Sequence, residues 1–169
     1  MNTPRSHGAA SEVRLCVPDT AQGLLATRLL FQEYANSLSR PECFTGFEEE
    51  LAALPWDYAA PRGNLLVAME GDQLLACCAL RPLDSVDYSN ACEIRRLYVR
   101  PQYRGQGLGR KLTEAQIDFA RMQGYSCMLL DTLSEMEAAR ALYEDLGFEE
   151  IPPYYFNPIA GSHYLKVAL

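Results

Sequence analysis

The spacing of apolar and polar residues divides the start of the chain into a strand and a helix. Residues 12–17 alternate polar and apolar side chains, as a half-buried strand does. Pro18-Asp19-Thr20 follows and offers an N-terminal cap, so we expect a helix that ends near Ser37. The predicted apolar stripe of this helix consists of Leu24, Leu25, Leu29, Leu30 and Tyr34.

A second, shorter helix is predicted from Gly46 to Leu54, directly before Pro55. Its apolar side carries Phe47, Leu51 and Leu54. The acidic triplet of this helix is expected to point mostly toward solvent, because a run of charges usually forms a solvated helix face; it consists of Glu48, Glu49 and Glu50.

The middle of the chain predicts three strands. Residues 64–70 and 73–80 are apolar runs joined by Gly71-Asp72, which indicates two antiparallel strands with a tight turn. Their continuous apolar character predicts burial on both faces. Residues 91–99 form the third strand, which ends before Arg100-Pro101.

A glycine-bearing loop over residues 102–106 follows this third strand. A helix is predicted from Gly107 to about Gln123, where Gly124 stops it, and a strand over residues 125–131 comes next. A connection of this length makes the strands 91–99 and 125–131 parallel.

The end of the chain completes the sheet. A helix is predicted from Glu135 to Leu146 with Gly147 as its C-terminal cap, followed by strands over residues 148–151 and 162–169. The expected fold is therefore α/β (α+β), a mixed and mostly antiparallel sheet with a central parallel strand-helix-strand unit and helices on both faces. Residues 1–10 are predicted to be a flexible leader to a single domain over residues 11–169.

Composition fits a globular protein in the cytoplasm. Residues of the hydrophobic class make up 49% of the chain, enough for a sizeable core. No apolar window reaches about 18 residues and the start has no apolar signal segment, so no membrane span and no secretion are expected. The six cysteines mostly lie in apolar runs and only two histidines are present, which predicts reduced core thiols and no metal site.

Charge is distributed unevenly along the chain. The net charge of −7 argues against nucleic-acid binding, whose affinity comes mainly from neutralised phosphates. The segment from Arg95 to Lys111 nevertheless holds six basic residues and no acidic one. Two interpretations stay open: the segment meets an anionic ligand, or it is a solvated basic face.

The glycines of this basic segment favour the anionic ligand. Gly105, Gly107 and Gly109 lie between a predicted strand and a predicted helix, where backbone N–H groups and the helix dipole attract a phosphate. A P-loop would need G-x-x-x-x-G-K-S/T, which the sequence lacks. A dinucleotide fingerprint would need G-x-G-x-x-G, and although Asp131 lies near the position of a ribose-binding acid, the loop follows the fourth predicted strand instead of opening the fold.

The string Arg104-Gly-Gln-Gly107-Leu-Gly109 resembles the R/Q-x-x-G-x-G/A element of the GNAT superfamily of N-acetyltransferases. In that family the loop binds the pyrophosphate of acetyl-coenzyme A (acetyl-CoA) through main-chain amides. The resemblance implies that acetyl-CoA serves as cosubstrate, and that a main-chain N–H near Leu97 polarises the thioester carbonyl. It assigns cofactor binding to Leu97, Val99, Arg104, Gly105, Gln106, Gly107, Leu108, Gly109 and Arg110.

A second motif supports the same family. Residues 138–148, Ala-Ala-Arg-Ala-Leu-Tyr-Glu-Asp-Leu-Gly-Phe, resemble the later family motif, in which a helix follows the parallel strand. The motif-level match spans residues 92–148, while the order of elements agrees from Glu12 to Leu169. The tail over residues 151–159 is similar to one bacterial subgroup of acetyltransferases. Many members carry Asn where this chain has Met136, a departure that affects a contact to the pantetheine arm.

Acetyl transfer to an amine needs a proton acceptor and a proton donor. An alkyl amine with a pKa of about 10.4 is neutral in only about one part in 10³ at pH 7, a deficit of roughly 4.6 kcal/mol. Glu93 matches the glutamate that some family members use as general base through a water; alternatively it pairs with Arg95 on the same strand face. Tyr143 matches the tyrosine that protonates the leaving thiolate in this family, and the alternative is core packing. A thiol nucleophile, from Cys92 or Cys127 with His163, is a less simple mechanism than direct attack in a ternary complex.

The leading hypothesis is an acetyl-CoA-dependent N-acetyltransferase that acts on a primary amine of a small molecule or peptide. The alternatives are a non-catalytic acetyl-CoA sensor, and an O- or S-directed or longer-chain acyltransferase. The resemblance places the acceptor against residues 34–58 and 152–162, and a homodimer stays open. These segments hold Glu42, Glu48, Glu49, Glu50, Asp57, Tyr58, Tyr154 and Tyr155. Two interpretations stay open: an acidic, aromatic acceptor mouth that favours a cationic amine, or glutamates that face solvent.

Overall fold

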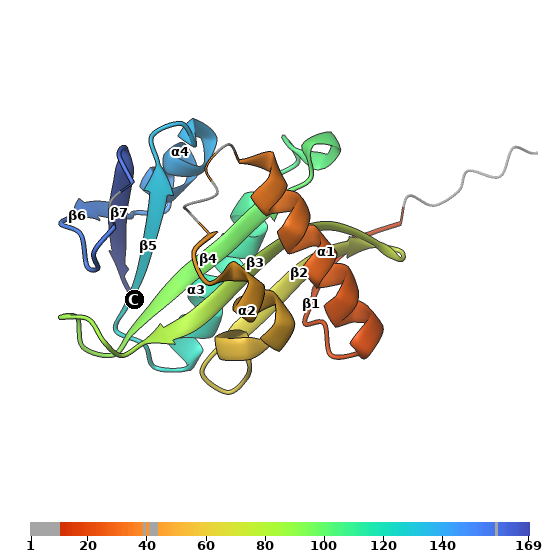
Figure 1. The fold of residues 1–169 in the computed structure, drawn as a ribbon, viewed down its shortest axis with the longest axis horizontal. Coiled ribbons are helices and arrows are strands. Elements are labelled where there is room, and N and C mark those ends of the chain that lie inside the picture. Colours follow the sequence, from red (N-terminus) through yellow and green to blue (C-terminus); the bar gives the residue numbers. More distant parts are fainter. Residues whose placement is uncertain (1–10, 39, 41–43, 158) are drawn as a thin grey trace, which may run out of the picture.

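A 7-stranded mixed sheet with the order β1-β2-β3-β4-β5-β7-β6 runs through the molecule (Figure 1). The computed structural model describes residues 11–38, 40, 44–157 and 159–169, and the predicted leader lies outside them. The strands are β1 Val13–Cys16, β2 Asn64–Glu70, β3 Gln73–Leu83, β4 Ala91–Val99, β5 Cys127–Leu133, β6 Glu149–Ile151 and β7 Ser162–Ala168. The helices are α1 Ala21–Ser37, α2 Phe47–Ala53, α3 Leu108–Met122 and α4 Glu137–Asp145.

The predicted fold class is confirmed. Only β4 and β5 pair in parallel among the described strands, through Ala91–Glu93 and Cys127–Leu129, and α3 connects them. The other ladders, from β1 to β4 and from β5 to β6, are antiparallel. The strand predicted at residues 125–131 begins later, because the Tyr125 N–H bonds to Ala120 O and closes the end of α3.

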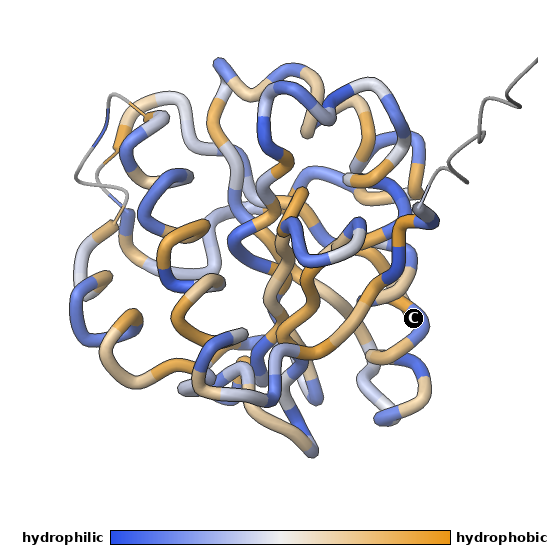
Figure 2. Tube along the Cα trace, turned by 90° about the vertical axis from the view of Figure 1, so that its right-hand side faces the viewer, coloured by the Kyte–Doolittle hydropathy of each residue, from blue (hydrophilic) through white to orange (hydrophobic). Residues whose placement is uncertain are grey.

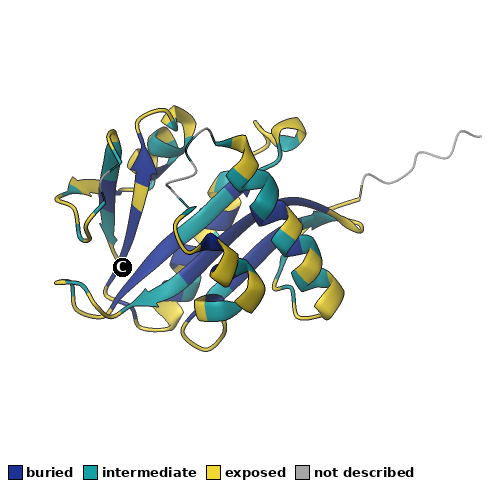
Figure 3. Ribbon diagram, in the orientation of Figure 1, coloured by how far each residue is buried: buried dark blue, intermediate teal, exposed yellow. Residues whose placement is uncertain are grey.

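Side-chain alternation in the central strands feeds two separate cores. On one face of the sheet, Leu66 and Ala68 of β2 pack with residues of α3, whereas Leu65 and Val67 face α1 and α2. The central strands are therefore buried on both faces, as their apolar runs predict (Figure 3). Hydrophobic stretches run through the middle of the chain trace, and hydrophilic ones lie mostly at the outside (Figure 2).

The N-terminal cap of α1 is confirmed, but its predicted apolar stripe is partly wrong. Thr20 Oγ1 accepts a hydrogen bond from Gly23 N at 3.0 Å. Leu25 and Leu29 are 53% and 62% exposed. The buried face instead holds Thr27, Leu30 and Phe31, and the Thr27 hydroxyl is satisfied by donating to Gly23 O. Because α1 carries leucines on more than one side, the sequence did not identify the face that packs against the sheet.

Two adjacent leucines of α1 test this assignment of the helix face. Leu30→Ala removes a fully buried side chain and should lower the free energy of unfolding by about 2–5 kcal/mol. Leu29→Ala is the matched control, because the same change at an exposed position should alter stability by less than about 0.5 kcal/mol. Urea unfolding followed by circular dichroism measures both, and similar losses for the two variants would contradict the assigned face.

Candidate active site

A cavity of about 610 Å³ opens where β4 and β5 separate. Strand pairing ends at Glu93 and Leu129, and the two strands then diverge (Figure 1). The cavity is lined by the two segments expected to hold the acceptor, together with the facing sides of both strands. From these segments it takes Tyr34, Leu38, Phe44 and Thr45, and Tyr154, Tyr155, Phe156, Asn157, Ile159 and Ser162.

An irregularity in β4 accompanies this divergence. Cys77 pairs with Tyr98 and Ala79 pairs with Arg95, so Arg96 and Leu97 together stand opposite Cys78 as a β-bulge. Arg96 has a φ of +57°, in the left-handed region that a residue with a side chain rarely adopts. The edge of β4 beyond Glu93, which includes Leu97 and Val99, forms no ladder with β5.

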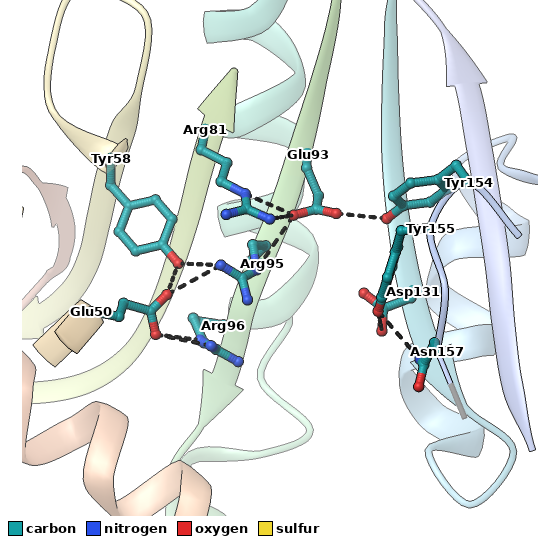
Figure 4. Close-up of polar contacts among 10 residues, drawn as sticks. All are labelled: Glu50, Tyr58, Arg81, Glu93, Arg95, Arg96, Asp131, Tyr154, Tyr155 and Asn157. Atoms are coloured by element: carbon teal, nitrogen blue, oxygen red, sulfur yellow. Dashed lines mark hydrogen bonds and ion pairs between the residues drawn. The ribbon is translucent and has the colours of Figure 1, made fainter. Parts of the chain in front are cut away.

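The side chain of Arg96 is held by a buried carboxylate. Glu50 is only 2% exposed, and its Oε2 accepts hydrogen bonds from Arg96 Nε at 3.1 Å and Nη2 at 2.9 Å. Its Oε1 accepts from Arg95 Nη1 at 3.2 Å and from the Tyr58 hydroxyl (Figure 4). The Arg96 guanidinium also lies over the rings of Phe44 and Phe47, at 4.9 and 5.2 Å from their centroids.

The expectation that Glu50 faces solvent is therefore wrong. Glu50 lies three residues after Phe47 and four before Leu54, so helical periodicity puts it on the apolar side of α2. Glu48 and Glu49 are exposed as expected, while Glu42 lies outside the described residues. Of the two interpretations of these acidic residues, the structure favours the solvent-facing one for Glu48, Glu49 and Asp57, which are exposed and do not line the cavity.

The basic segment is not one continuous patch. Arg95 and Arg96 pair with Glu50, Arg100 pairs with Glu33 at 2.9 Å, and Arg110 pairs with Asp145. Among the described residues no carboxylate lies within ion-pair distance of Arg104 or Lys111. Arg104 Nε donates to Val99 O at 2.9 Å, and its side chain is exposed beside the glycine loop.

The glycine loop itself is open to a ligand. Gly105 and Gly107 have φ values of +80° and +77°, and a Cβ at either position would meet nothing within 4 Å. Gly107 is the N-cap of α3, and Leu108 behind it is buried and fixes the start of the helix in the core. Exposed main-chain N–H groups at this helix end carry partial positive charge, so the loop can hold an anion. Gly109 is helical and packs against Leu142 and Val99.

The two predicted catalytic residues lie in different surroundings. Glu93 lines the cavity. Tyr143 is a residue of α4 that packs into the core, where it is 6% exposed and lies edge-on against Phe148. Burial raises the pKa of the Tyr143 phenol well above its usual value, so the phenol keeps its proton. Met136, in place of the family's Asn, lines the cavity and accepts a hydrogen bond from Thr132.

Glu93 is fully engaged by neighbouring side chains. Its Oε1 accepts from Arg81 Nε at 2.9 Å and lies 3.4 Å from Arg95 Nε, and its Oε2 accepts from the Tyr154 hydroxyl at 2.7 Å. The carboxylate is 2% exposed. The pairing with Arg95 expected from the strand spacing is thus present, alongside two partners that the sequence did not indicate (Figure 4).

A second carboxylate, Asp131 of β5, lines the same cavity. Its Oδ2 accepts from the Tyr155 hydroxyl at 2.8 Å, and Asn157 Nδ2 donates to that hydroxyl at 3.3 Å. Desolvation by the surrounding protein atoms raises the pKa of Asp131, and the negative charge of Glu93 raises it further. The hydrogen bond from Tyr155 and the positive charges of Arg95 and Arg96 lower the pKa by a smaller amount. Sequence reasoning weighed Asp131 as a ribose ligand and gave it no role in catalysis; its place at the end of the predicted strand over residues 125–131 was the available signal.

A cysteine nucleophile finds no support. Burial raises the pKa of the Cys92 thiol to about 12 and also raises that of Cys127, which disfavours the reactive thiolate. His163 bonds to Ser134 at 2.7 Å and to Glu150 at 2.9 Å instead of to a thiol. Five cysteines are free, four of them buried, and Cys43 lies outside the described residues.

Over the described ranges no group of three or more His, Cys, Asp or Glu is arranged to hold a metal ion. No helix within these ranges combines the length and apolarity of a membrane span.

A sheet that opens between two parallel strands, beside a glycine loop at a helix N-terminus, is the architecture of acyl-transferring proteins of the GNAT fold, and the comparisons agree. The model of the acetyltransferase (GNAT) family matches residues 29–148. An uncharacterized N-acetyltransferase of Schizosaccharomyces pombe is 35% identical over 94% of this chain and 96% of its own length. The chain therefore belongs to the GNAT family of acetyltransferases.

Solved structures share the fold. An acetyltransferase from Streptococcus agalactiae superposes with a TM-score of 0.77 at 21% identity, covering 93% of this chain and 98% of that one. The PaiA N-acetyltransferase of Thermoplasma acidophilum, solved in complex with coenzyme A, superposes with a TM-score of 0.72 at 15% identity, covering 94% and 99%. At these identities the likeness establishes the fold.

The buried ion pairs of α2 can be tested by comparing two neighbouring glutamates. Glu50→Gln leaves Arg95 and Arg96 without their shared counter-charge, which should lower the free energy of unfolding by about 3–5 kcal/mol. Glu49→Gln, at an exposed position of the same helix, is the control and should change it by less than about 0.5 kcal/mol. Equal stability of the two variants in urea unfolding would show that the pairs contribute nothing to the fold.

Proposed function

We propose that the protein transfers an acetyl group from acetyl-CoA to a primary amine of a small molecule or peptide, by direct attack in a ternary complex. The observation that carries the proposal is the open glycine loop at the start of α3, next to a stretch of β4 that β5 leaves unpaired. Membership of the GNAT family and the coenzyme A complex of a fold neighbour support it. The free, buried thiols are compatible with a reducing compartment, and we place the reaction in the cytoplasm.

The residues proposed to hold acetyl-CoA fit its chemistry. The main-chain amides from Arg104 to Gly109 offer donors for a pyrophosphate, and the left-handed glycines leave room for it. Arg104 adds an uncompensated positive charge, whereas Asp145 partly neutralises Arg110. Leu97 and Val99 offer main-chain groups to an extended pantetheine arm, as an unpaired strand edge does for a peptide.

The chemistry of transfer divides between two groups of residues. We propose that Tyr143 donates a proton to the departing sulfur, because its neutral phenol carries the proton that a general acid gives up. Proton acceptance is assigned to a carboxylate of the cavity, where Glu93 and Asp131 are the candidates. The main-chain N–H near Leu97 is proposed to stabilise negative charge on the carbonyl oxygen.

A glycine substitution tests the phosphate loop. Gly107→Glu places a side chain and a negative charge where the pyrophosphate is proposed to bind, so acetyl-CoA affinity should fall at least about 100-fold. Gly71→Glu is a matched control, because Gly71 also has a positive φ and open space but lies in the β2–β3 turn. Isothermal titration with acetyl-CoA measures both variants.

This titration, combined with a thiol-release assay of amines, has three outcomes that lead to different conclusions. Loss of binding in Gly107→Glu alone supports the loop assignment. Wild-type binding without thiol release for any amine would make the protein an acetyl-CoA sensor instead of an enzyme. A folded wild-type protein that does not bind acetyl-CoA would overturn the proposed function.

The role of Tyr143 can be separated from its packing by removing only its hydroxyl. Tyr143→Phe keeps the ring against Phe148, so the melting temperature should hold while kcat falls about 10²-fold or more. Tyr125→Phe is the converse control: it deletes the hydroxyl that donates to Arg62 O at 2.7 Å and should cost about 1 kcal/mol of stability without a change in kcat. Full activity of Tyr143→Phe would leave this tyrosine as a core residue.

A further inference from the structure

Asp131 lines the cavity with Glu93, and it differs from Glu93 and from the nearby buried Glu50 in its lack of an arginine partner within the described residues. Glu50 is held by Arg95 and Arg96, and Glu93 by Arg81 and Arg95. Among the described residues, Asp131 takes part in no ion pair within 4.0 Å and accepts one hydrogen bond, from Tyr155. It is solvent-exposed through the cavity that it lines. One acidic oxygen therefore remains available to a positively charged ligand.

The groups that face Asp131 come from three elements. From β4 these are Glu93, Arg95 and Arg96, and from the loop after β6 they are the hydroxyls of Tyr154 and Tyr155. From β7 it is Tyr164, whose position in the ladder is directly opposite Asp131. The arginines already have carboxylate partners, so the charge that a ligand would meet first is the carboxylate of Asp131.

The cavity wall also carries apolar side chains beside its polar ones. Phe156, at the rim, is 90% exposed and offers an aromatic surface to a ligand. Leu38, Phe44, Val86 and Ile159 line the cavity as well. A ligand with one positive charge and an apolar body matches both features. A second charge at the far end of such a ligand, of either sign, would lie among these apolar side chains and lose its solvation.

On the basis of the function proposed above, we propose that Asp131 binds the ammonium group of a singly charged primary amine with an apolar body and accepts its proton. The amine nitrogen then forms a bond to the carbonyl carbon of the thioester, and the C–S bond breaks with its electron pair on sulfur. Of the two protons that the nitrogen loses, one ends on that sulfur, which leaves as the thiol, and the other passes from Asp131 to solvent. Glu93 remains ion-paired and holds the cavity wall.

Three amines that differ only at the far end test the substrate class. Hexylamine, hexamethylenediamine and aminocaproate share one chain and present a methyl group, an ammonium and a carboxylate at its end. In wild-type protein, kcat/KM measured by thiol release should be at least about 10-fold higher for hexylamine, because an extra charge of either sign loses its solvation beside the apolar side chains of the wall. Equal rates for all three would overturn the assigned class.

Asp131→Asn tests the residue, with Asp118→Asn on the exposed face of α3 as the control. The variant keeps the size of the side chain and an oxygen for Tyr155, so it should fold and bind acetyl-CoA as the wild type does. Its kcat/KM for hexylamine should fall about 10²-fold or more, and Asp131→Glu should recover part of the loss. Retention of wild-type activity in Asp131→Asn would overturn the proposal.

A proton-transfer role also predicts a change in which amines react, which a structural role would not produce. Trifluoroethylamine is far less basic than ethylamine and needs little help to lose its proton, so Asp131→Asn should impair it much less. The wild-type kcat/KM should decline at acidic pH as Asp131 becomes protonated, above the usual pKa of an aspartate, and Asp131→Asn should lack this decline. Equal loss for both amines would overturn the role of Asp131 as proton acceptor. Failure of the wild type to bind acetyl-CoA would instead overturn the proposed function itself.

Discussion

The buried pair of Glu50 with Arg96 is the interaction on which the candidate site depends. Arg96 occupies a left-handed backbone conformation inside a strand, which costs of order 1–3 kcal/mol and persists only where the surroundings enforce it. Two hydrogen bonds to Glu50 Oε2 and the rings of Phe44 and Phe47 supply that enforcement from α2 and the residues before it. The bulge so fixed lies in the stretch of β4 that leaves β5, so one ion pair links the helix layer to the opening of the sheet.

The ion pairs continue from this point across the wall of the cavity. Arg96, Glu50, Arg95, Glu93 and Arg81 alternate in sign, and each charge has at least one partner of opposite sign (Figure 4). Such a chain gives each buried charge a hydrogen-bonding partner and holds the side chains rigidly in place. Asp131 stands outside the chain, and this separation lets one carboxylate of the cavity differ in chemistry from the others.

Sequence reasoning predicted the features that depend on neighbours in the chain. The bounds of β4, the cap at Thr20 and the glycines before α3 follow from alternation, capping and left-handed turns, all of which act within a few residues. Glu50 was misplaced because its partners Arg95 and Arg96 lie 45 and 46 residues away, and only the packing of α2 against the sheet brings them near. Leu25 and Leu29 show the same limit, since composition does not reveal which side of an amphipathic helix meets the sheet.

The arrangement also separates the two proposed substrates in the fold. The glycine loop is tied to α3, whose side chains belong to the core between α3 and the sheet. The outer wall of the cavity includes the segments after α1 and after β6, which contribute few residues to that core. Substitutions at Phe156 or Ile159 can therefore alter which amine fits while the main-chain donors before α3 keep their positions. A family that keeps one donor molecule and varies its acceptors needs this independence, and here it follows from which elements share a core.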